Sequence, residues 1–97
     1  VHKPAAVISS SRRAGSVTSM DVLNKHLSIS EMPIVTSNYW NEVHGHTPSD
    51  VEQDIEGLDT MYALGKNMAW MLKCIEAGKK AGIEIPQNTK RTTNFIR

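Results

Sequence analysis

The sequence has little of what several classes of protein require. Cys74 is the only cysteine among 97 residues, so neither a disulfide nor a cysteine-based metal site can form within one chain. No apolar run approaches the roughly 18 residues that cross a bilayer, which excludes a membrane helix. A net charge of +1 without a basic, aromatic-interleaved stripe argues against nucleic-acid binding. We therefore expect a cytoplasmic protein in which Cys74 is a small buried apolar residue.

Several catalytic patterns are also missing. No Ser/His/Asp spacing, glycine-rich phosphate loop or pair of carboxylates stands out, so hydrolysis and phosphoryl transfer have no support. His44 and His46 have a spacing that metal ions use, but two histidines alone make a poor site. We expect them to form hydrogen bonds or to lie at an interface, and we predict no catalytic side chain and no metal ligand.

What the sequence does contain is the alternation of an α/β protein. Its 39% hydrophobic and 22% charged residues are typical of a globular chain. Apolar, β-branched runs predict strands at residues 5–10 and 32–37, and helical periodicity predicts helices at 17–28 and 50–81. Strands that are separated by a helix pair in parallel, so the sequence predicts a parallel sheet.

The first helix has one clear apolar face. Met20, Leu23 and Leu27 recur at three- and four-residue spacing, which places them on the same side of a helix. Either Ser16 or Thr18 is suited to cap its first turn. We expect this face to pack on the sheet.

The second helix begins with a capping box, in which Ser49 is the cap and Glu52 reaches back to it. Gly65 should allow a neighbouring backbone to approach closely, although a bend at Gly57 or Gly65 is the alternative. At about 1.5 Å per residue the helix is longer than a small sheet can cover, so we expect part of it at a subunit interface, with ordinary core packing as the alternative. Its apolar stripe comprises Val51, Ile55, Leu58, Met61, Tyr62, Gly65, Met68, Ala69, Leu72 and Ile75.

Two unusual loops follow the predicted strands. Residues 9–15 are small, polar and doubly basic, and residues 38–46 contain Tyr39, Trp40 and His44. Because the carboxyl ends of parallel strands lie at one edge of a sheet, we expect the two loops to meet there. Ligands of α/β proteins bind at that edge, near helix N-termini.

Residues 3–15, 23–25, 32–35, 39–45 and 65–73 carry a resemblance to a known family. Their Ser-Arg-Arg-Ala-Gly loop, Tyr-Trp-Asn loop and Gly-Lys-Asn-Met-Ala-Trp helix together resemble the flavodoxin-fold family of NAD(P)H-dependent FMN reductases. The resemblance extends from Lys3 to about Ile83. It implies the C-terminal β-α-β-α half of a flavodoxin-like, doubly wound parallel sheet.

The resemblance also implies that something is missing. Members of that family carry further strands and the loop that holds the FMN phosphate ahead of this region. We therefore expect residues 1–83 to be the C-terminal half of an FMN reductase domain, residues 84–97 to be a tail, and an N-terminal half to be a partner. A pair of strands alone is marginally stable. If the chain is stable on its own, we therefore expect a homo-oligomer that buries the sheet edge which the missing strands normally meet.

The cofactors that the resemblance implies are FMN and, as electron donor, NAD(P)H. Tyr39 and Trp40 would cover a flat ring, with core or interface packing as the alternative. Arg12 and Arg13 would contact either the flavin or the phosphates of the nicotinamide cofactor. Alternatively, they are solvated loop cations, partners in an intersubunit salt bridge, or part of a basic kinase-recognition string. The flavin-contact loop would comprise Ser10, Ser11, Arg12, Arg13, Ala14 and Gly15.

The resulting prediction is the flavin-contacting half of an NAD(P)H-dependent flavin oxidoreductase. Hydride would pass from nicotinamide to flavin N5, and the protein would supply positioning rather than acid or base groups. We expect the fragment alone to be inactive. The alternative is a non-catalytic oligomerisation or regulatory half-domain that no longer binds flavin.

Overall fold

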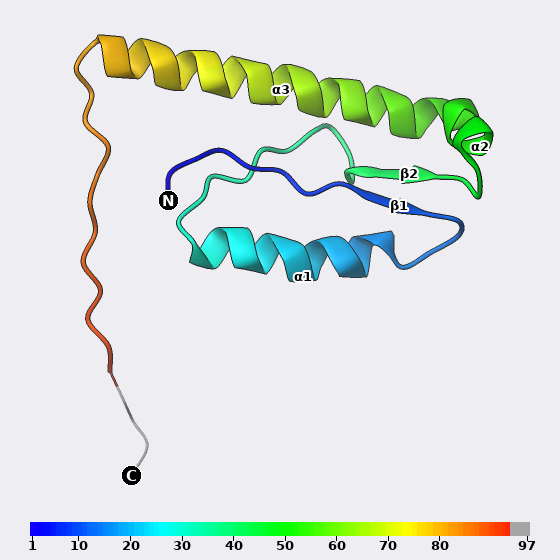
Figure 1. Cartoon of the computed structure of the whole chain (residues 1–97), viewed down its shortest axis with the longest axis horizontal. Coiled ribbons are helices and arrows are strands. Elements are labelled where there is room, and N and C mark those ends of the chain that lie inside the picture. Colours follow the sequence, from blue (N-terminus) through cyan, green and yellow to red (C-terminus); the bar gives the residue numbers. More distant parts are fainter. Residues whose placement is uncertain (94–97) are drawn as a thin grey trace.

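The computed structural model describes residues 1–93 of the chain (Figure 1). Two short strands pair in parallel and alternate with helices, so the predicted α/β class and β-α-β-α order are confirmed. The tail that was predicted at 84–97 lies partly outside the described residues. The elements are β1 (Ser9–Ser11), α1 (Ser16–Ile29), β2 (Glu42–His44), α2 (Pro48–Gln53) and α3 (Ile55–Lys80).

The second strand is not where the sequence predicted it. Residues 32–37 contribute only one bridge, between Ile34 and Ala5, and the paired strand β2 lies later in the chain, where Glu42 is opposite Ser9. Between these two points the chain leaves the sheet and forms a turn. The turn is stabilised by hydrogen bonds that local periodicity does not reveal.

The strands lie between the helices, with α1 on one side and α3 on the other (Figure 1). The predicted first helix is confirmed, and Met20 on its inner face is buried. Leu23, which was predicted to share that face, is 48% exposed. The predicted side-chain cap is wrong, because Gly15 with φ +96° is the cap residue and makes no side-chain hydrogen bond.

The predicted single helix at 50–81 is two helices. Thr47 and Asp50, rather than Ser49 and Glu52, form the capping box that begins α2. The chain then leaves helical geometry at Asp54, which caps α3 by accepting a hydrogen bond from the Gly57 main-chain N–H. The break therefore lies at a capping carboxylate and not at a glycine.

The apolar stripe that was predicted for the long helix is only partly covered. The buried residues of α3 are Gly57, Thr60 and Leu64. Tyr62 is 71% exposed, and a Cβ at Gly65 would meet no atom within 4 Å. The close backbone approach that was expected at Gly65 therefore does not occur within the described part of the chain.

The chain exposes more surface than a compact protein of its size. Its accessible surface is 7961 Å², against about 5,500 Å² for a compact monomer of this mass. The radius of gyration is 17.3 Å, against roughly 12.5 Å for a compact fold. The exposed residues 84–93 account for part of the difference. Among the described residues, the buried apolar core consists of Met20, Val35 and Leu64.

No helix within residues 1–93 has both the length and the apolar character that crossing a membrane requires.

Candidate functional site

The β1–α1 loop leaves its polar residues exposed at the carboxyl end of β1. Arg12, Arg13 and Ala14 are exposed, and Gly15 takes a left-handed conformation that glycine adopts without steric cost. Because no side chain caps α1, the first amides of that helix keep their hydrogen-bonding capacity for other acceptors. The loop thus offers two guanidinium groups and free main-chain donors.

Two serines anchor this loop to the sheet. The Ser16 hydroxyl donates a 2.7 Å hydrogen bond to the Ser11 hydroxyl, and Ser16 is 3% exposed. This bond joins the first turn of α1 to the end of β1, so the direction in which the loop leaves the strand is set from both sides. It also shows that the Ser11 side chain is on the α1 face of the sheet.

The carboxyl end of β2 is held by Asp54. Its Oδ2 accepts a 2.8 Å hydrogen bond from the His44 main-chain N–H, and its Oδ1 accepts one of 3.0 Å from Gly57. The His44 imidazole Nδ1 lies 3.8 Å from Oδ2. These donors, first Gly57 and then His44, hold the pKa of Asp54 below its ordinary value. The expected hydrogen bonding of His44 is thus observed for its main-chain N–H, whereas its imidazole lies beyond hydrogen-bond distance of Asp54.

Replacing Asp54 with alanine is expected to lower the unfolding free energy by about 1 kcal/mol at pH 7, because the cap of α3 is lost. A carboxylate whose pKa is depressed by folding stabilises the protein above its unfolded pKa of about 3.9, and that contribution is lost as the pH falls through the folded-state pKa. The difference between wild type and variant should therefore shrink below about pH 4. Urea unfolding followed by circular dichroism at pH 7, 4 and 3 measures it.

Asp59→Ala on the exposed side of α3 serves as the control. It removes the same charge without removing a cap, and its small effect should follow no such trend. A D54A difference that stays constant from pH 7 to pH 3 would contradict the role given to the carboxylate.

Tyr39 and Trp40 do not lie at the same end of the sheet as the arginine loop. Both precede β2, whose first residue Glu42 is level with Ser9, whereas residues 12–15 follow the other end of β1. The expected convergence of the two loops is therefore confirmed for His44, which is opposite Ser11, and is wrong for the main chain at Tyr39 and Trp40. The displaced position of β2 explains the difference.

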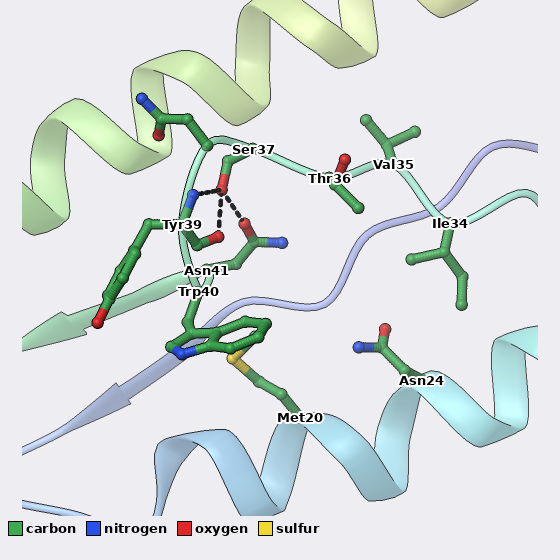
Figure 2. Close-up of a pocket in the computed structure, with 10 residues that line it drawn as sticks. Met20, Asn24, Ile34, Val35, Thr36, Ser37, Tyr39, Trp40 and Asn41 are labelled. Carbon is green, nitrogen blue, oxygen red and sulfur yellow. Dashed lines mark hydrogen bonds between the residues drawn. The ribbon is translucent and has the colours of Figure 1, made fainter.

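A pocket of about 400 Å³ lies beside Trp40, between α1 and residues 34–41 (Figure 2). Trp40 and Met20 line the same pocket, and its wall continues along Ile34 and Val35. The Asn24 Oδ1 is buried and has no hydrogen-bond partner. The pocket therefore has the mixed lining of apolar side chains and a few polar groups that is typical of small-molecule sites.

The turn that positions Tyr39 and Trp40 depends on two polar residues. The Ser37 hydroxyl lies 2.5 Å from the Asn41 Oδ1 and 2.8 Å from the Tyr39 carbonyl oxygen (Figure 2). The Asn41 Nδ2 donates a 3.1 Å hydrogen bond to the Val7 carbonyl, so the turn is attached to the chain just before β1. The two aromatic rings have centroids 6.1 Å apart.

Sequence reasoning assigned no role to Asn24, Ser37 or Asn41. In the sequence, each of the three is a polar residue near apolar or aromatic neighbours. A polar residue in an exposed loop has the same sequence pattern, so their structural role could not be predicted. Cys74, in contrast, was predicted to be buried, and this is wrong: it is exposed, in an apolar groove beside Trp70. Within residues 1–93, no group of three or more potential ligands could hold a metal ion.

Comparison with known proteins adds no relative, because no family model, no curated protein and no solved structure matches the chain.

Proposed function

We propose that this chain is the FMN-contacting half of an NAD(P)H-dependent flavin oxidoreductase. In this proposal, its parallel strands are the C-terminal β-α-β-α part of a flavodoxin-like sheet. The observation that carries the proposal is the exposed loop at the carboxyl end of β1, which leads into the uncapped N-terminus of α1. Ligands of α/β proteins bind at that position.

The residues of the loop fit what a flavin requires. The edge of its ring needs main-chain N–H donors that can approach closely, and Ala14 and Gly15 have no bulky side chain in the way. Arg12 and Arg13 supply guanidinium groups, which bind phosphate through paired hydrogen bonds. FMN, when bound, would accept hydride from NAD(P)H at N5 and pass electrons to an acceptor.

In this proposal the chain itself supplies binding and orientation. The Ser11–Ser16 hydrogen bond holds the loop in one conformation, so the loop amides are arranged before the ligand binds. The positive charge of Arg12 and Arg13 would favour an anionic ring edge or a nicotinamide phosphate. Such a protein would work in the cytoplasm, together with an N-terminal half that completes the sheet.

The second candidate is a non-catalytic oligomerisation or regulatory half-domain. It is favoured by the large exposed surface and by apolar side chains that nothing covers, such as Ile8, which is 61% exposed. It is also favoured by the position of Tyr39 and Trp40, which precede β2 instead of following it. This candidate predicts no affinity for FMN.

A flavin titration separates the two candidates. FMN fluorescence should be quenched as the purified chain is added, and Arg12→Ala combined with Arg13→Ala should weaken the affinity about tenfold or more, because hydrogen bonds to charged groups are lost. Lys79→Ala combined with Lys80→Ala removes the same charge from the exposed end of α3 and should leave the affinity unchanged.

Two results would reject parts of the proposal. Equal affinity of wild type and the double arginine variant would remove the role of the arginines. No quenching at millimolar chain would favour the half-domain without flavin.

A further inference from the structure

The outer edge of β1 has main-chain groups that β2 does not use. The Ser9 N–H donates to the Asn41 carbonyl at 3.0 Å, and the Ser11 carbonyl accepts from the Gly45 N–H at 3.0 Å. Successive residues of an extended chain direct their main-chain groups to opposite edges. The Val7 carbonyl, like Ser9 and Ser11, pairs on the β2 side, so the main-chain groups of Ile8 and Ser10 are directed away from β2. The strand therefore has a free edge.

Apart from the short length of β1, which is three residues, this edge lacks the features that usually protect one. Residues 5–11 contain no charged residue and no proline, and they contain no glycine. Exposed edges of stable monomers carry lysine, proline or a bulge, because an unprotected edge pairs with another strand. The neutral sequence of this segment is that of a paired strand.

Apolar side chains beside the edge are uncovered on both faces of the sheet. Ser11 faces α1, so Ile8, three residues earlier, faces the opposite side, where it is 61% exposed. On the α1 side, Asn24 lines the Trp40 pocket. Leu23 lies on the opposite side of Met20 around the helix, and it is 48% exposed. A strand added at this edge would bring cover to both side chains.

We propose that the occupant of this edge is a second copy of the chain, paired antiparallel to β1 about a two-fold axis at Ile8. The two copies then form one continuous four-stranded sheet with the order β2-β1-β1-β2. Ile8 meets Ile8 of the second copy on the same face, and Ala6 is opposite Ser10, so small residues oppose small residues. The charged residues Lys3 and Arg12 lie outside the paired segment.

The chain as a whole exposes enough surface for a dimer interface, of which the β1 edge is one part. A stable dimer buries about 800 Å² on each partner. The chain exposes 7961 Å², which exceeds the compact-monomer value by about 2,400 Å², and the tail supplies only part of this excess. An isologous interface also needs a self-complementary patch, which a neutral strand edge with a central isoleucine provides.

Sedimentation equilibrium of the purified chain tests the proposal. The wild-type mass should be twice 10.8 kDa. Ser10→Pro removes an N–H that points to the free edge and leaves the β1–β2 hydrogen bonds in place, since proline is accepted on edge strands. It should raise the dimer dissociation constant about a hundredfold or more. Each copy loses hydrogen bonds across the interface, and the proline ring occupies space that the facing strand needs.

Two further variants keep the test decisive. Ile8→Lys puts a charge at the two-fold axis without changing the main chain, and it should also yield a monomer. It tests the proposal even if S10P fails to fold. Val22→Lys, on the exposed outer side of α1, should remain a dimer. Circular dichroism reports whether each variant keeps its helices.

The proposal concerns the chain on its own, because the N-terminal half of the proposed flavin domain would occupy the same edge of β1. Its outcomes remain distinct from those of the flavin titration, since it does not rest on flavin binding. A monomeric wild type would overturn it and would leave the edge to a different polypeptide. A dimer that persists in both S10P and I8K would also overturn it and would point to another surface, such as the exposed side of α3.

Discussion

Replacing Gly45 with alanine is expected to lower the unfolding free energy by about 2 kcal/mol, because the new Cβ has no room. It would lie 2.7 Å from the Val51 main-chain nitrogen and 3.0 Å from the Asp50 Cβ. The first of these atoms belongs to the backbone of α2 and cannot move independently. The substitution therefore separates α2 from the end of β2, and urea unfolding followed by helical circular dichroism measures the loss.

Gly65→Ala is the matched control. A Cβ at Gly65 meets nothing within 4 Å, and the residue lies in the interior of α3. Alanine should therefore raise stability by about 0.5–1 kcal/mol, since glycine is the poorer helix former. Both variants must be compared at one protein concentration, because association changes apparent stability. Equal effects of the two substitutions would show that the contact with Val51 is unimportant.

Replacing Asn41 with alanine is expected to lower the unfolding free energy by about 2 kcal/mol. Asn41 is 8% exposed, and the substitution leaves the Val7 carbonyl without its side-chain donor and removes one of the hydrogen bonds of the Ser37 hydroxyl. A buried polar group that loses its hydrogen bond costs more than the bond itself contributes. The turn before β2 should loosen, so the tryptophan fluorescence should change together with the stability.

Asn38→Ala provides the comparison for Asn41. Asn38 is exposed in the same turn, so its replacement should change stability by less than about 0.5 kcal/mol. Thermal unfolding and fluorescence spectra of the two variants should therefore differ clearly. An N41A variant with wild-type stability would mean that the turn is held mainly by its contact with neighbouring apolar side chains.

The positions of the helices could be predicted from the sequence because helices depend on local spacing. The face of α1 that carries Met20 follows from periodicity, and the loop after β1 follows from its small and basic residues. The exposure of Leu23 and Tyr62 could not be predicted, because periodicity identifies an apolar face without saying whether a neighbour covers it. The same limitation applies to Cys74, which lies in an open groove instead of a core.

By itself, the sequence determined the α/β class, the order of the elements and the parallel direction of the strands, since these follow from local patterns and from the length of the connecting helix. Only the tertiary structure decided that β2 begins at Glu42 and that the last helix is divided at Asp54. The first outcome depends on a hydrogen bond between distant residues, from Asn41 to Val7. The second depends on the Asp54 carboxylate, which accepts hydrogen bonds from Gly57 within α3 and from His44 at the end of β2. The hydrogen bonds from Asn41 and His44 form only when the chain is folded, so no local sequence pattern predicts them.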